Sequence, residues 1–94
     1  MKVSFDPAKR SKTLDERGLD FADADLVFAD WTITGVDDRF EYGETRYFTA
    51  GFLSGRMVII CWTLRDNSCH VISMRKANDR EIKKYKSRFP QASE

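Results

Sequence analysis

The spacing of the apolar residues changes near Trp31, and this change constrains the fold more than any other feature. Before it, "LDFADADLVFAD" repeats apolar residues at the spacing of one helix face. After it, apolar and polar residues alternate as they do in strands, with polar turns between the runs. The expected strands are residues 31–35, 45–52, 56–65 and 69–75. This order predicts an α+β domain with an antiparallel sheet, two N-terminal helices and one C-terminal helix.

The ends of the helices carry recognisable signals. After a short strand in "VSF", Asp6 can cap a helix that has Pro7 at its first position and ends at Gly18. Asp20 is the expected cap of the second helix.

The last helix also has a marked start. Asn78 and Glu81 have the spacing of a capping box, in which each side chain binds the other residue's backbone N–H. Ile82, Tyr85 and Phe89 give this helix a buried face before proline 90 stops it.

The strand "MVIICWTL" is apolar on both faces and is therefore expected at the centre of the sheet. If both hairpins pair tightly around their loops, the numbers of two residues opposite each other sum to about 108 in the first hairpin and about 134 in the second. Both sums are even, so odd-numbered residues share one face of the sheet and even-numbered residues share the other. The even face is nearly all apolar and is where the helices should pack. The odd face is mixed and is the better candidate for binding; it holds Tyr47, Thr49, Met57, Ile59, Cys61, Thr63, Arg65, Val71, Ser73 and Arg75.

Two arginines stand near opposite ends of this odd face. Arg65 and Arg75 are expected roughly 17–20 Å apart at the rise of a strand. That is too far for one phosphate, but it suits a few nucleotides of a single strand, with Tyr47 available for base stacking and Lys76 for the backbone.

Charge is unevenly distributed along the 94 residues, whose net charge is +1. Residues 1–55 carry seven Lys or Arg against eleven Asp or Glu, a net charge of −4, and residues 56–93 carry nine against three, a net charge of +6. A basic half fits a surface that contacts phosphate. No apolar run is long enough for a membrane span, and the first residues lack the apolar stretch of a signal peptide, so we expect a cytoplasmic protein.

Arg75 is the strongest single candidate for a site residue. It ends a strand and precedes a helix start, so it could hold an anion together with free N–H groups. The alternative is a surface arginine paired with Glu81 or Asp79. The lysines of the last helix more simply form a solvated face.

The remaining candidates have competing structural explanations. His70 is the only histidine, and its parity puts it on the core side of the sheet. Tyr85 fits core packing, although a phenol at the edge of a pocket can donate a proton. Lys9 could reach the sheet or remain a first-turn surface lysine.

Metal-dependent and nucleophilic chemistry are disfavoured. Cys61 and Cys69 are not expected to face each other, and one histidine with two distant cysteines falls short of a zinc set. There is no Gly-rich phosphate loop and no Ser/His/Asp or Cys/His arrangement. We therefore expect no metal and no cofactor.

An ordered set of segments resembles the BrnT family of bacterial type II toxins. These segments are "FDPAK", "RGLDFADA", "GETR", "VIICWTLR" and "VISMRKAND" leading into "REIKKY", and they run from about Phe5 to Tyr85. The resemblance implies a RelE-like fold in a single domain over residues 1–94. It implies a ribonuclease that blocks translation and a BrnA-type antitoxin with a ribbon-helix-helix domain. Operator DNA would be bound only through that antitoxin.

Carried onto this chain, the family pattern picks out eight residues. They are Lys9, Glu44, Arg46, Arg65, Arg75, Ala77, Glu81 and Tyr85. The chain departs from the family where Glu16, Arg17 and Gly18 replace a Lys-His-Gly stretch, and where His70 replaces an arginine at the start of the last strand.

RNA can be cut without metal when its 2′-hydroxyl attacks the adjacent phosphorus. We expect Arg65 and Arg75 to stabilise charge, and Lys9 and Tyr85 to transfer protons or position the substrate. Glu44 and Arg46 are expected to form a structural pair, and Asn78 and Glu81 to support Arg75. The competing hypotheses are a non-catalytic co-repressor bound to its antitoxin and a simple RNA-binding module.

Overall fold

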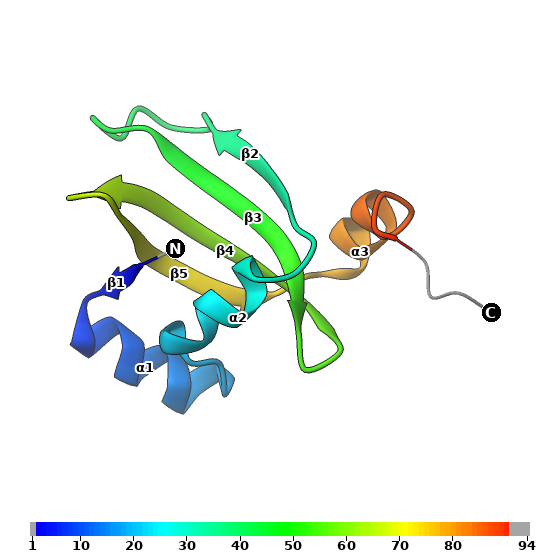
Figure 1. Cartoon of the computed structure of the whole chain (residues 1–94), viewed down its shortest axis with the longest axis horizontal. Helices are drawn as coiled ribbons and strands as arrows, with labels where there is room; N and C mark the ends of the chain where they lie inside the picture. Colours follow the sequence, from blue (N-terminus) through cyan, green and yellow to red (C-terminus); the bar gives the residue numbers. More distant parts are fainter. Residues whose placement is uncertain (1, 91–94) are drawn as a thin grey trace.

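A five-stranded mixed sheet with helices on both faces forms the structure, a computed structural model that describes residues 2–90 (Figure 1). The strand order is β1-β5-β4-β3-β2, with β1 parallel to β5 and the other neighbours antiparallel. In chain order the elements are β1 (Val3–Phe5), α1 (Pro7–Arg17), the 3-10 turn η1 (Phe21–Asp23), α2 (Ala24–Phe28), β2 (Ile33–Asp37), β3 (Arg46–Leu53), β4 (Arg56–Arg65), β5 (Ser68–Lys76) and α3 (Asp79–Lys86). The expected α+β class is confirmed.

The first hairpin pairs one residue away from the expected register. Its loop is a two-residue turn, because Ser54 and Gly55 both adopt positive φ, 52° and 76°. Tyr47 consequently pairs with Trp62, and every β3 side chain lies on the face opposite to the expected one. The expectation that Tyr47 shares a face with Arg75 was therefore wrong.

The pairing register of the second hairpin differs from the expected one near the turn and agrees with it further along the strands. Asp66 and Asn67 form another two-residue turn with positive φ, so the pairing starts one residue off. A β-bulge in the middle of the β4–β5 pairing then restores the expected register. His70 and Val71, between the turn and the bulge, lie on faces opposite to the expected ones, whereas Arg75 lies where it was predicted.

One face of the sheet, which we call the α2 face, packs against η1 and α2. Val58, Ile60 and Met74 are fully buried there, together with Phe21 and Val27 from the helical segment. A side chain at position 51 would prevent this packing: a Cβ on Gly51 would lie 2.5 Å from Val27 Cγ1. The absence of that Cβ lets α2 approach the strand closely.

The opposite face, the α3 face, has its own smaller core. Tyr85 and Phe89 pack there on Ala50, Met57 and Ile59. The expectation that all helices would pack on one face was wrong, because the sheet is apolar on both faces where α3 covers it. In Figure 1, α3 lies apart from α1 and α2.

The expected helix caps are confirmed. Asp6 and Asp20 accept hydrogen bonds from the backbone N–H groups two residues later, at 2.8 and 2.9 Å. Helix α1 nevertheless buries no side chain, and polar contacts hold it: Arg10 forms a 2.7 Å ion pair with Asp20. Within residues 2–90, no helix is long and apolar enough to span a membrane.

Candidate active site

The junction between β5 and α3 fixes the position of Arg75. The N–H of Ala77 donates to the carbonyl of Met57 at 3.0 Å, which extends the pairing with β4 past the end of β5. Asn78 then caps α3 by accepting from the Glu81 N–H at 2.8 Å, and Glu81 accepts from the Asn78 N–H at 3.0 Å. The predicted capping box is confirmed, and it holds the turn rigidly.

Glu81 also binds the guanidinium of Arg75 with both carboxylate oxygens, at 2.7 and 2.8 Å. This pair raises the pKa of Arg75, and the hydrogen bonds from Arg75 lower the pKa of Glu81. Glu81 is therefore ionised at neutral pH. One carboxylate thus caps the helix and aims the arginine.

Arg75 and Glu81 line a pocket of about 250 Å³ on the α3 face. Tyr85 and Lys84 of α3 contribute to the same pocket, and Tyr85 packs on Phe48 with ring centroids 6.1 Å apart. The other lining residues come from β2, the segment after it, and β4: Val36, Asp37, Asp38, Arg39, Ile59 and Cys61. The pocket combines an apolar floor with several charged groups, as ligand sites commonly do.

Three of these charged residues, Asp37, Asp38 and Arg39, were missed when "DDRFEYG" was interpreted only as a polar link. Arg39 binds both oxygens of Asp37, at 2.8 and 3.0 Å, and Tyr42 donates to the same carboxylate at 3.2 Å. These hydrogen bonds lower the pKa of Asp37, which is buried. The charge of Arg39 is a small further influence on the pocket: it partly opposes the rise in the pKa of Arg75 and adds slightly to the lowering of the pKa of Glu81.

The phenyl ring of Phe48 forms part of the pocket because β2 has glycine opposite it. A Cβ on Gly35 would lie 2.6 Å from Phe48 Cε2. The ring can therefore lie across the strand only while position 35 lacks a side chain.

Comparison with models of known protein families identifies the family of this chain. The family model for the ribonuclease toxin BrnT of type II toxin-antitoxin systems matches residues 5–81. This chain belongs to the BrnT family. No curated protein matches it.

The BrnT match covers Arg75 and Glu81 but ends before Tyr85. Of the eight residues that the resemblance indicated, Arg75, Glu81 and Tyr85 line the pocket, and Ala77 forms the turn beside it. The pocket therefore gathers three of the eight, with a fourth in the adjoining turn.

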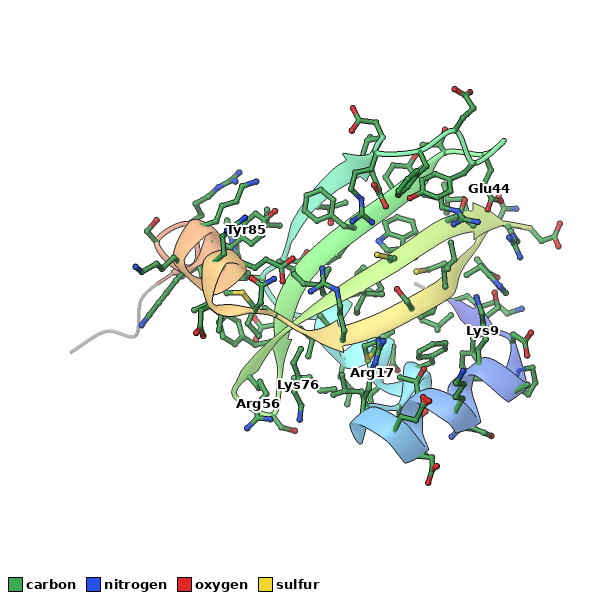
Figure 2. All side chains as sticks on the ribbon, turned by 180° about the vertical axis from the view of Figure 1, so that it is seen from behind. Lys9, Arg17, Glu44, Arg56, Lys76 and Tyr85 are labelled. Atoms are coloured by element: carbon green, nitrogen blue, oxygen red, sulfur yellow. The ribbon has the colours of Figure 1, made fainter. Side chains whose placement is uncertain are left out.

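A second group lies at the other end of the sheet. Glu44 accepts from Arg46 at 3.2 Å, so the predicted pair is confirmed, and it also pairs with Arg65 at 3.3 Å. Arg65 and Arg75 share the α3 face as expected, and six residues of β4 separate their pairing positions, which is roughly 20 Å. Figure 2 shows Glu44 and Tyr85 at opposite ends of the sheet.

His70 belongs to this second group. Its Nδ1 lies 3.1 Å from the Ser4 hydroxyl, and burial together with the charge of Arg65 lowers its pKa. The lowered pKa favours the neutral imidazole at pH 7. His70 does not line the pocket around Arg75.

Three candidates lie away from the pocket. Lys9 lies on α1 in a groove against β5, and Lys76 lines a neighbouring groove (Figure 2). Tyr47 stacks on Trp62 on the α2 face, with ring centroids 4.6 Å apart. The residues first considered together thus occupy three separate surfaces.

The chemistry that the pocket offers is acid–base and electrostatic. It places guanidinium, ammonium, carboxylate and phenol groups around one cavity. Within residues 2–90, no group of three or more His, Cys, Asp or Glu side chains could hold a metal ion.

Proposed function

We propose that the pocket around Arg75 is the active site of this ribonuclease toxin, and that it cleaves RNA without using a metal ion. The observation that carries the proposal is the bidentate Arg75–Glu81 pair beside Tyr85 in a charged pocket. A cation, a carboxylate and a proton donor around one cavity are what in-line cleavage by the 2′-hydroxyl needs.

In the proposed reaction, Glu81 accepts the proton of the 2′-hydroxyl as its oxygen attacks phosphorus. Arg75 turns from Glu81 toward the phosphate and stabilises the negative charge of the phosphorane. The bond from phosphorus to the 5′-oxygen breaks, and Tyr85 gives its phenolic proton to that oxygen. The products are a 2′,3′-cyclic phosphate and a 5′-hydroxyl, and exchange with water restores Glu81 and Tyr85.

Neighbouring cations extend the site along the RNA. Lys84 lines the pocket with its ammonium 5.3 Å from the centre of the Tyr85 ring, and Arg39 adds a largely exposed guanidinium. Arg65, at the far end of the same face, can bind a phosphate a few nucleotides away. Lys9, Lys76 and Tyr47 lie outside this path, so we assign them no contact with the scissile phosphate.

The biological role follows from the family. We propose that cleavage inhibits translation, and that a BrnA-type antitoxin with a ribbon-helix-helix domain neutralises the toxin and carries the complex to operator DNA. These roles rest on the resemblance of the segments from Phe5 to Tyr85.

The test is cleavage of a labelled RNA by the purified chain, with and without EDTA. We expect cleavage that persists in EDTA and yields cyclic phosphate ends. Arg75→Ala should slow it by roughly 100- to 1,000-fold, the usual cost of losing one charge-stabilising donor. Arg80→Ala is the matched control, because Arg80 is an exposed arginine of α3, close to Arg75 in the sequence but outside the pocket. Equal rates for the two variants would exclude Arg75, and loss of activity in EDTA would exclude the metal-independent route.

A non-catalytic co-repressor is the second candidate. One observation favours it: in the free chain Glu81 already occupies both ends of the Arg75 guanidinium. The same assay separates the two, because RNA that is retained but never cut identifies a binding protein.

A further inference from the structure

Part of the outer edge of β5 has no neighbouring strand. Strand β1 pairs with β5 only from Cys69 to Val71, because the chain turns away at Asp6 into α1. Among the described residues, no strand pairs with the edge beyond the bulge up to Lys76; Lys76 is exposed there, whereas Met74 is covered and Arg17 contacts its carbonyl. An open edge presents backbone groups that another chain can pair with.

The hydrogen-bond pattern shows which backbone groups face outward. Ala77 donates to its pairing partner Met57, so Ala77 and, two residues earlier, Arg75 bond to β4. In antiparallel pairs the bonding alternates, so the N–H and C=O of Met74 and Lys76 point away from β4. The Met74 carbonyl confirms this direction, because it accepts a 3.0 Å hydrogen bond from Arg17 of α1.

Two grooves follow this edge, and Glu16 and Arg17 line both. The first, of about 300 Å³, lies between α1 and the bulge region of β5, and the second continues to Arg75 and Lys76. Figure 2 shows Arg17 reaching from α1 to β5, with Lys76 further along the strand. Because α1 buries no side chain, it can shift at little cost in packing.

The charge of these grooves is strongly positive. They are lined by Lys9, Lys12, Arg17, Arg75 and Lys76 against a single carboxylate, Glu16. In the described part of the chain, only Arg75 of these cations pairs with a carboxylate. The edge thus combines backbone groups that point away from β4 with an excess of positive charge.

Arg75 connects this edge to the proposed active site, because it lines both the pocket with Tyr85 and the groove with Lys76. We propose that an extended acidic segment of the antitoxin adds to β5 as a strand at Met74–Lys76, its carboxylates pairing with Arg75 and the lysines of the edge. Main-chain pairing supplies register, and the carboxylates supply specificity. The antitoxin would thereby occupy the arginine that the RNA phosphate needs.

The outward peptide groups favour a protein over RNA at this edge. Met74 and Lys76 present their N–H and C=O groups at the two-residue spacing of a strand, roughly 7 Å, which matches an extended peptide. In the bound state Arg17 exchanges the Met74 carbonyl for a carboxylate of the segment.

The inference rests on the proposed function for its inhibitory consequence, but its test does not measure RNA cleavage. The probe is the full-length cognate antitoxin that the family implies, added to the ¹⁵N-labelled full-length toxin. We expect the amide of Lys76, which is exposed, to exchange quickly with D₂O in the free toxin and at least tenfold more slowly in the complex. The Ser73 and Arg75 amides, which face β4, should be protected in both states.

A matched pair of variants separates backbone pairing from charge. Lys76→Ala removes only the ammonium, whereas Lys76→Pro also removes the outward N–H, a change that an edge strand tolerates. We expect the proline variant to bind the antitoxin about tenfold more weakly than the alanine variant, the loss for one hydrogen bond of about 1.4 kcal/mol. Lys12→Glu should also weaken binding, and Lys83→Glu, on exposed α3, should not.

Three results would overturn the inference. A Lys76 amide that stays unprotected in a tight complex would place the antitoxin elsewhere. Equal affinities of the two Lys76 variants would exclude strand addition. Protection by a single-stranded RNA oligonucleotide, or by raising the concentration of the toxin alone, would assign the edge to RNA or to a second copy.

Discussion

Replacing Glu81 separates two interactions that this carboxylate makes. Glu81→Gln keeps an oxygen for the Asn78 N–H, since glutamine also completes a capping box, but it loses the charge that binds Arg75. Glu81→Ala loses both. Comparing the two variants therefore measures the ion pair apart from the cap.

The expected free energies follow from the geometry. A hydrogen-bonded pair with a charged group contributes about 1.5–3 kcal/mol when buried, and an exposed pair about 0–1 kcal/mol. The Arg75 and Glu81 side chains are 38% and 22% exposed. Because solvent screens a partly exposed pair, we expect it to contribute about 1 kcal/mol to the free energy of unfolding. We expect Glu81→Gln to lower the free energy of unfolding by about 1 kcal/mol and Glu81→Ala by about 2 kcal/mol, the cap supplying the difference.

Urea denaturation at pH 7 measures these values, and a double-mutant cycle with Arg75→Ala isolates the pair. The coupling energy should be about 1 kcal/mol. Because the folded-state pKa of Glu81 is lowered below its ordinary value of 4.5, the contribution is fully present above pH 4.5 and is lost as the pH falls through the folded-state pKa. A coupling energy near zero at pH 7, or one that does not decline below pH 4.5, would refute the reasoning.

Three further predictions concern the pocket and its supports. Gly35→Ala should cost about 1–3 kcal/mol, because the new Cβ would lie 2.6 Å from Phe48 Cε2; an unchanged melting temperature would contradict this. Burial raises the pKa of the Cys69 thiol to about 11, so at pH 8 one thiol should react in the native chain and two after denaturation; two fast native reactions would refute it. Because Cys61 lines the pocket, a bulky thiol label there should stop RNA cleavage while Cys61→Ser retains it, and an active labelled protein would contradict the site.

Local signals predicted the elements of this fold well. The caps at Asp6, Asp20 and Asn78 form as expected, since a cap involves only residues two or three positions apart. Strand β4 has the predicted bounds and lies at the centre of the sheet. The strand expected at residues 31–35 instead begins two residues later, where pairing with β3 begins.

The positive φ of Ser54 decided which face each β3 side chain occupies. It shortened the first loop to two residues and moved Tyr47 to the face opposite Arg75. Non-glycine residues rarely adopt this conformation, so a serine at this position did not indicate it. The bulge in β5 depends on packing across the sheet and left no comparable signal.

The sequence by itself determined the order of the elements, the BrnT family and the turn that aims Arg75, because each depends on neighbouring residues or on the ordered set of segments. Only the tertiary structure decided that Arg39 and Lys84 share a pocket with Arg75, and that Lys9 and Tyr47 lie outside it. These groupings join residues far apart in the chain. For Tyr47 the physical cause is strand register, because a change of one residue in the hairpin loop moves every β3 side chain to the other face of the sheet.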